Sequence, residues 1–316
     1  NSRQRFFGIP TMKDRAKQFL LLMALEPEWE ARFEPNNYGL RPGLSCQDAR
    51  VAICQSLEQK AKYVFDASIE PCFPTTSHKP LLDKLNTIPR FRRQIRAWLT
   101  AGITFEEITE PNLTETFQAA PISPLLTNIA LHGLEKYVTK QLGTWSKRGK
   151  LPKEVVMSNG ITVRYANNFV ILYPYFEVLE KVVIEIDRFL VPLGLNISKH
   201  NSSIKHTLLN QNGQNAGFSF LGFYFLHKKC GIGKTSWLAN KEECKQLGYY
   251  LSQTPDNENV KRHIESIRDI VKNMEKSPQE KLIAKLYLII HGWTQYYAFS
   301  DNKSTFKFCY ERMFGR

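Results

Sequence analysis

Two strand-like segments carry the polar side chains best suited to chemistry. In Ala61–Ile69, Asp66 and Ser68 are two positions apart, so on a strand both face the same side, about 7 Å from each other. The pair Asn167 and Asn168 interrupts a second run of apolar and β-branched residues. Phosphoryl-transfer sites hold Mg²⁺ with charged oxygens, and an amide carbonyl is a much poorer ligand. One carboxylate among four polar positions therefore argues against a two-metal centre.

Other chemistry is weakly indicated. A shifted single-metal site on Asp66 is the alternative to a purely structural role for that residue, and the structural role is preferred because coordination tolerates only small displacements. The run Gly231–Thr235 has the wrong spacing for a phosphate-binding loop, and a polar hairpin turn is the better interpretation. The cysteines show no zinc-ligand spacing and are expected to be reduced thiols; they are Cys46, Cys54, Cys72, Cys230, Cys244 and Cys309.

Alternating helical and strand patterns surround these residues. Apolar spacing predicts a helix over Met12–Phe33, and this spacing is typical of a buried face. Its apolar positions are Phe19, Leu20, Met23, Ala24, Trp29 and Phe33. Further helices are expected over Leu81–Gly102, from Pro121, over Phe176–Leu193 and over Val260–Met274, and an aromatic strand is expected over Phe218–Leu226. Ser277–Glu280 is predicted to open the last strong helix as a capping box. This order favours an α+β fold over a doubly wound sheet.

Composition limits the class of protein. The 316 residues are 42% apolar, enough for a substantial core in two or three subdomains. A formal net charge of +13 favours a polyanionic partner. No apolar run is long enough for a membrane span, and the N-terminal pattern is neither a signal nor a transit peptide.

Basic residues cluster in three places, and they are the candidate RNA-binding positions. The first cluster lies on the helix that contains Trp98, the second on a polar loop near residue 150, and the third on the C-terminal helices. The candidate residues are Arg90, Arg92, Arg93, Arg96, Lys147, Arg148, Lys150, Lys261, Arg262, Lys272, Lys281 and Lys285. Lys and Arg surfaces contact phosphates, and the aromatics Tyr249, Tyr250, Trp293, Tyr296 and Tyr297 are candidates for base stacking. For Trp293, which continues an apolar stripe, a core position is the favoured alternative.

Eight segments, in one order, resemble the reverse transcriptase of group II intron-encoded proteins, the maturases. They are Phe7–Arg15 and Glu34–Gly43 (fingers), Tyr63–Phe73 (first palm strand), Gln118–Asn128 (template and primer helix), Tyr165–Phe169 (palm hairpin), Gly194–Lys199 (next palm motif), Phe218–Phe223 (palm edge strand) and His291–Tyr297 (thumb, or domain X). The resemblance implies a right-hand fold with an antiparallel palm sheet and a helical thumb. The implied domains are 1–60 as partial fingers, 61–238 as palm and 239–316 as thumb.

Departures from the family pattern fall on its catalytic positions. Ser68, Asn167 and Asn168 stand where the family has three metal-binding aspartates. Pro74 replaces an acidic residue, and Ala119-Ala120 replaces a Gly-Gly pair. The resemblance therefore implies that the Mg²⁺ site is lost, that no cofactor is bound and that the chain is not an enzyme.

Three functions remain open for such a chain. The first is a catalytically inactive, RNA-binding splicing maturase that stabilises a folded intron. The second is an architectural subunit of a larger assembly, such as a ribosome, a polymerase or another ribonucleoprotein, recruited from a maturase. The third, weaker, is a residual RNA-directed DNA polymerase. The expected partner is structured RNA, and the expected location is a bacterial cytoplasm or the interior of a plastid or mitochondrion.

Overall fold

The computed structural model describes residues 9–58, 60–70, 78–101, 103–105, 108–110, 120–148, 160–198, 202–211, 213–230 and 247–314. The chain divides into two compact units. The first consists of Asn1–Ser56 and Tyr63–Ile204, and the second of Leu57–Lys62 and Lys205–Arg316. Within the described ranges, no helix is both long and apolar enough to cross a membrane.

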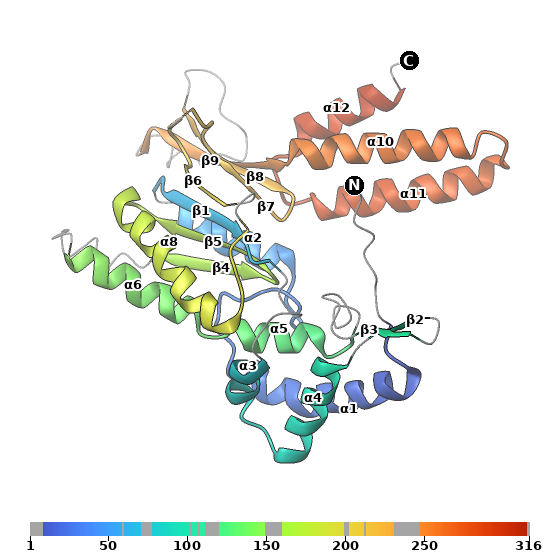
Figure 1. Ribbon diagram of the computed structural model, residues 1–316. Coiled ribbons are helices and arrows are strands. Elements are labelled where there is room, and N and C mark those ends of the chain that lie inside the picture. Colours follow the sequence, from blue (N-terminus) through green and yellow to red (C-terminus); the bar gives the residue numbers. More distant parts are fainter. Residues whose placement is uncertain are drawn as a thin grey trace. The chain divides into compact units, whose positions relative to one another are not determined.

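Three strands of a four-stranded sheet form the centre of the first unit, and the boundary between the units falls within the fourth strand, β6 (Ser203–His206). The other strands are β1 (Tyr63–Ser68), β4 (Ile161–Tyr165) and β5 (Asn168–Tyr173), and the order in the sheet is β4-β5-β1-β6. β5 pairs antiparallel with both β1 and β4 (Figure 1). The strand and hairpin predicted from the sequence are thus confirmed, as is the α+β class.

Two helices cover one face of this sheet. These are α6 (Leu134–Arg148) and α8 (Phe176–Leu190), which lie side by side (Figure 1). α8 continues into a short 3-10 turn at Val191–Leu193. The apolar core between sheet and helices includes Phe65, Ala67, Phe169 and Ile171. Because strand side chains alternate between faces, the even-numbered residues of β1 and β5 lie on the face away from these helices.

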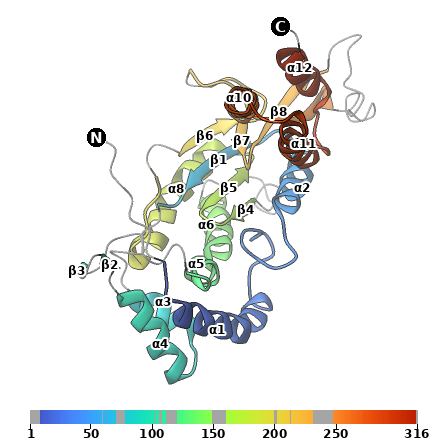
Figure 2. The ribbon, with the colours of Figure 1, turned by 90° about the vertical axis from the view of Figure 1, so that its right-hand side faces the viewer.

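A helical cluster completes the first unit. It contains α1 (Met12–Glu30), α3 (His78–Leu85), α4 (Pro89–Thr100) and α5 (Ser123–Leu131), with a small hairpin of β2 (Ile103–Phe105) and β3 (Ile108–Glu110). A further helix, α2 (Cys46–Leu57), contributes no residue to the core of this cluster. In Figure 2, α1, α3 and α4 lie next to one another below α5. Trp29, Leu82, Ile95 and Leu126 belong to their shared core. Pro124 lies in the first turn of α5, where a missing N–H costs nothing, as predicted.

The second unit joins an aromatic sheet to three helices. Its strands are β7 (Phe218–Phe220), β8 (Phe223–Lys229) and β9 (Tyr249–Pro255), and its helices are α10 (Asn257–Asn273), α11 (Gln279–Tyr296) and α12 (Lys303–Phe314). Tyr296 and Tyr297 donate hydrogen bonds to the carbonyls of Leu221 and Gly222 in the β7–β8 turn. Phe223 stacks on Tyr296. The predicted boundary at residue 239 lies outside the described residues.

The predicted buried face of the first helix is wrong for most of its members. Trp29 and Phe33 are buried, but Phe19, Leu20 and Met23 are 49%, 67% and 71% exposed. α1 instead turns Leu25 and Trp29 inward, together with the polar Gln18. Apolar side chains occupy both faces of this helix, so periodicity alone did not identify the buried one.

Two smaller expectations are also corrected. No side-chain cap forms at the start of α11, because Pro278 occupies the N-cap position and Ser277 lies one residue outside it. Cys46, Cys54 and Cys309 are reduced, as expected, but Cys230 is disulfide-bonded. Cys72 and Cys244 lie outside the described residues.

Candidate functional site

The positions predicted to be degenerate lie together at one end of the central sheet. Ser68 is paired directly with Asn168 across β1 and β5. Both are even-numbered, so they lie on the sheet face opposite α6 and α8, and Asp66 lies on the same face two residues back. Asn167 is in the turn between β4 and β5, and its carbonyl accepts a hydrogen bond from the N–H of Ile69 at 2.8 Å.

The segment after α8 completes this end of the sheet. Ser198 donates its N–H to the carbonyl of Ser68 at 2.8 Å, and Glu70 donates to the carbonyl of Asn196 at 2.9 Å. Ile69 and Ile197 form an antiparallel bridge. Three sequence motifs that are far apart in the chain therefore meet within a few residues of Ser68.

The donor set at this end of the sheet does not fit a pair of Mg²⁺ ions. Asp66 supplies a carboxylate, while Ser68, Asn167 and Asn168 supply only neutral oxygens. Mg²⁺ prefers carboxylates and sheds its water reluctantly, so neutral oxygens compete poorly for it. Within the described ranges, no group of three or more His, Cys, Asp or Glu side chains is arranged to hold a metal ion.

The loop after α1 packs against the hairpin turn. Tyr38 N–H donates to the carbonyl of Arg164 at 2.8 Å, and Arg164 N–H donates to the carbonyl of Asn36 at 2.9 Å. The loop thus pairs with the outer strand β4 and covers its edge. Gly39 lies against the backbone of Tyr165 and Ala166, where a Cβ atom would collide with the Ala166 nitrogen. A glycine is required here because two backbones are in contact.

Arg164 and Asn128 connect this loop to α5. Arg164 is 3% exposed, and its guanidinium donates to Asn128 Oδ1 at 3.0 Å and to the carbonyl of Ala166 at 3.2 Å. Asn128 donates to the carbonyl of Gly39. Burial lowers the pKa of Arg164 to about 10, which leaves the group charged at neutral pH. This buried cation fixes the geometry of the turn that carries Asn167.

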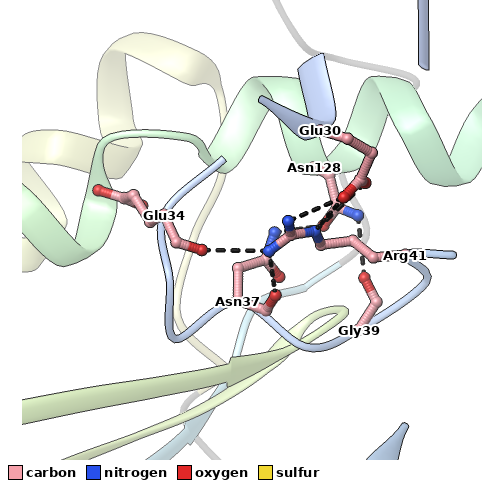
Figure 3. A network of polar contacts seen from close by, with 6 residues as sticks. All are labelled: Glu30, Glu34, Asn37, Gly39, Arg41 and Asn128. Atoms are coloured by element: carbon pink, nitrogen blue, oxygen red, sulfur yellow. Dashed lines mark hydrogen bonds and ion pairs between the residues drawn. The ribbon is translucent and has the colours of Figure 1, made fainter. Parts of the chain in front are cut away.

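Arg41 and Glu34 hold the same loop from its other side (Figure 3). Arg41 forms an ion pair with Glu30 at 2.8 Å and donates to the carbonyls of Glu34 and Asn37. The Glu34 carboxylate accepts the N–H groups of Glu135 and Lys136 at the start of α6, where the helix dipole favours an anion. Burial raises the pKa of Glu135, and its hydrogen bonds from Asn36 act in the opposite direction.

The basic cluster on α4 forms an exposed face. Arg90, Arg93 and Arg96 recur every three residues and are exposed, while Ile95 and Trp98 turn into the core. α4 carries no acidic residue. Arg92 differs from the other three, because its guanidinium pairs with Asp83 and donates to the carbonyl of Leu82. Three of the four predicted arginines are thus available to an anionic ligand.

The other basic candidates lie in more mixed surroundings. Lys147 and Arg148 end α6, with Arg148 over the Trp145 ring, and Lys150 lies outside the described residues. On α10, Lys261 pairs with Glu258 and Arg262 hydrogen-bonds Asn259, while Lys272 is exposed on a helix that also carries Glu265 and Asp269. Lys281 and Lys285 are exposed one turn apart on α11.

Most of the aromatics considered for base stacking are engaged within the protein. Trp293 is partly buried, stacks on His263 at 4.4 Å between ring centroids and contacts Phe306, which favours the core alternative. Sequence reasoning missed Tyr287, which is 61% exposed on α11 and stacks on His291. Only the helical register, which sets it about 120° around the helix from Trp293, could have revealed its exposure.

Comparison with known proteins gives two family matches. Residues 1–251 match the model of the reverse transcriptase (RNA-dependent DNA polymerase) family, and residues 260–316 match the group II intron, maturase-specific domain. Protein YkfC of Escherichia coli (strain K12) is 26% identical over 281 residues, covering 80% of this chain and 71% of YkfC.

Other relatives are intron-encoded or maturase-like proteins. The group II intron-encoded protein LtrA of Lactococcus lactis subsp. cremoris is 30% identical over 141 residues, covering 44% of this chain and 23% of LtrA. Maturase-like protein 1 of Euglena gracilis is 25% identical over 300 residues, covering 94% of this chain and 54% of the relative. The matched part is thus less than two thirds of either of these two relatives.

Proposed function

Because the chain belongs to the reverse transcriptase (RNA-dependent DNA polymerase) family and contains a group II intron maturase-specific domain, we propose that it is a splicing maturase that no longer polymerises. In this role the protein binds folded intron RNA and the RNA performs the chemistry. Such a protein acts by binding the active RNA fold more tightly than other folds, and it needs no metal ligands of its own. We place it in a bacterial cytoplasm or an organelle interior.

One observation supports the proposed loss of polymerase activity. Ser68, Asn167 and Asn168 lie together at the end of the sheet, and all three are neutral. Phosphoryl transfer depends on metal ions that neutralise charge developing on the phosphate. The frame around the site is retained, since Val163, Phe169 and Val170 are fully buried.

Nucleotide incorporation tests this loss directly. The purified chain is incubated with oligo(dT)-primed poly(rA), labelled dTTP and Mg²⁺ or Mn²⁺, alongside the variant Asp66→Ala. We expect the parent chain to incorporate no more labelled dTTP than the background measured with Asp66→Ala. Incorporation by the parent that disappears in Asp66→Ala would establish a shifted metal site and overturn the proposal.

Restoring the carboxylates gives a readout that is independent of activity. In the variant Ser68→Asp/Asn167→Asp/Asn168→Asp, four carboxylates share one end of the sheet and repel each other in the absence of metal. We expect millimolar Mg²⁺ to raise its thermal unfolding midpoint by several degrees and to leave the parent unchanged. An equal Mg²⁺ effect on both proteins would contradict the account.

The exposed arginines of α4 support RNA as the partner. A helix face with three unshielded guanidinium groups and no acidic residue suits a phosphate backbone. The relatives LtrA and the Euglena protein are named as an intron-encoded protein and a maturase-like protein, which points to intron RNA for this chain as well.

A second candidate function has one observation in its favour. Ile283, Tyr287 and Leu288 of α11 are 56%, 61% and 71% exposed, and such surface suits a protein partner in a stable assembly. This candidate predicts a fixed set of proteins recovered in stoichiometric amounts with the native chain.

A further inference from the structure

The outward face of α1 is apolar along nearly the whole helix. The exposed residues that form it, here called the α1 stripe, are Met12, Ala16, Phe19, Leu20, Met23, Ala24 and Pro27. At 1.5 Å per residue the stripe is about 22 Å long. Its opposite face packs into the core through Leu25 and Trp29, and among the described residues the stripe contributes nothing to that core.

Surface of this kind marks an interaction site. Met12, Leu20 and Met23 are 77%, 67% and 71% exposed, and Phe19 is 49% exposed. Single exposed apolar residues are common in soluble proteins, but a continuous stripe over four helical turns is not. Burial of this stripe against a partner would remove apolar surface from water and so stabilise the complex.

Charges beside the stripe change sign along the helix. At 100° per residue, Lys13 and Lys17 lie on one flank near the N-terminal end, and Glu28 lies on the same flank near the C-terminal end. On the other flank, Arg15 lies near the N-terminal end and Glu26 near the C-terminal end. Each flank is therefore basic at one end and acidic at the other.

We propose that the α1 stripe binds the α1 stripe of a second copy in an antiparallel, twofold arrangement. A twofold axis in the interface, between Leu20 and Leu21, keeps each flank opposite the same flank of the second copy. It sets Lys13 opposite Glu28 and Arg15 opposite Glu26. The same axis position therefore sets opposite charges against each other on both flanks. At the centre of the interface, Leu20 of one copy contacts Leu20 of the other.

Other occupants suit these charges less well. A nucleic acid would meet Glu26 and Glu28 along half of the stripe, and a parallel pair of helices would set like charges opposite each other. Glu28 already pairs with Arg32 of its own chain at 2.6 Å, both about half exposed, so Lys13 of the second copy would share that carboxylate. A pair of single helices is a small interface, and we expect micromolar dissociation.

Sedimentation equilibrium of the nuclease-treated full chain tests the pairing. The expected mass rises with micromolar concentration from 36.6 kDa towards twice that value. Leu20→Glu is expected to hold the mass at 36.6 kDa, whereas Ile184→Glu, a matched change at a 59% exposed position on α8, should leave association unchanged. A monomer at all concentrations up to about 100 µM, or equal association of Leu20→Glu and the parent, would overturn the proposal.

Charge exchange tests the antiparallel geometry. Lys13→Glu alone sets two carboxylates opposite each other twice per dimer, and we expect the dissociation constant to rise about fivefold or more. Lys13→Glu combined with Glu28→Lys reverses both ends of the pair and should restore association. If the combined variant stays as weak as Lys13→Glu alone, the antiparallel arrangement is wrong. RNA binding by Leu20→Glu is expected to persist, so this proposal and the maturase proposal fail independently.

Discussion

At the scale of single residues, the candidate site combines close backbone pairing with neutral side chains. Ser68 and Asn168 face each other across two strands, and the carbonyl of Asn167 accepts a hydrogen bond from the N–H of Ile69. The identities of these residues and their alternation on strands could be read from the sequence. Arg164 could not, because burial of a charged group depends on partners such as Asn128 that lie far away in the chain.

Gly39 gives a residue-scale prediction for the frame of the site. Gly39→Ala inserts a Cβ atom into the backbone of the hairpin turn, and we expect it to lower the free energy of unfolding by about 2 kcal/mol or more. Gly143→Ala is the matched control, because its Cβ would meet open space on α6 and should raise helix stability by up to about 1 kcal/mol. Urea unfolding of both variants measures the difference. Equal effects would show that the loop does not contact the turn as described.

At the scale of elements, patterns predicted where helices and strands lie more reliably than which faces they bury. Strands β1, β4 and β5 and helices α8 and α10 were anticipated closely, since their apolar periodicity has one clear face. α1 was placed correctly but oriented wrongly, because both of its faces are apolar. The single helix expected over Leu81–Gly102 is in fact two, and a short break at residues 86–88 precedes Pro89 of α4.

The α4 arginines give an element-scale prediction. Arg90→Gln/Arg93→Gln/Arg96→Gln removes three phosphate contacts and should weaken binding to a folded group II intron RNA. The plot of log affinity against log salt should become less steep by roughly two units. Filter binding from 50 to 300 mM KCl measures both effects.

Arg92→Gln is the matched control, since Asp83 already holds this guanidinium. It should change the slope little. An unchanged slope in the triple variant would remove α4 from the RNA interface.

At the scale of the whole molecule, the order of the sequence motifs predicted the family. Hydrogen bonds join five of these motif segments to one another in the fold. The five segments begin at Glu34, Tyr63, Gln118, Tyr165 and Gly194. Such long-range pairing does not depend on metal ligands, because the apolar frame and the backbone hydrogen bonds hold these segments together without them. What the chain binds depends on its surfaces, and exposure could not be read from the sequence.

Crosslinking in the native host tests the central claim most directly. RNA crosslinked by ultraviolet light to the native protein is sequenced, and copurifying proteins are quantified by mass spectrometry. The account predicts recovery of one or a few folded intron RNAs, with at least tenfold less from the α4 triple-arginine variant. Recovery of no intron RNA, together with a fixed and stoichiometric set of proteins, would contradict it.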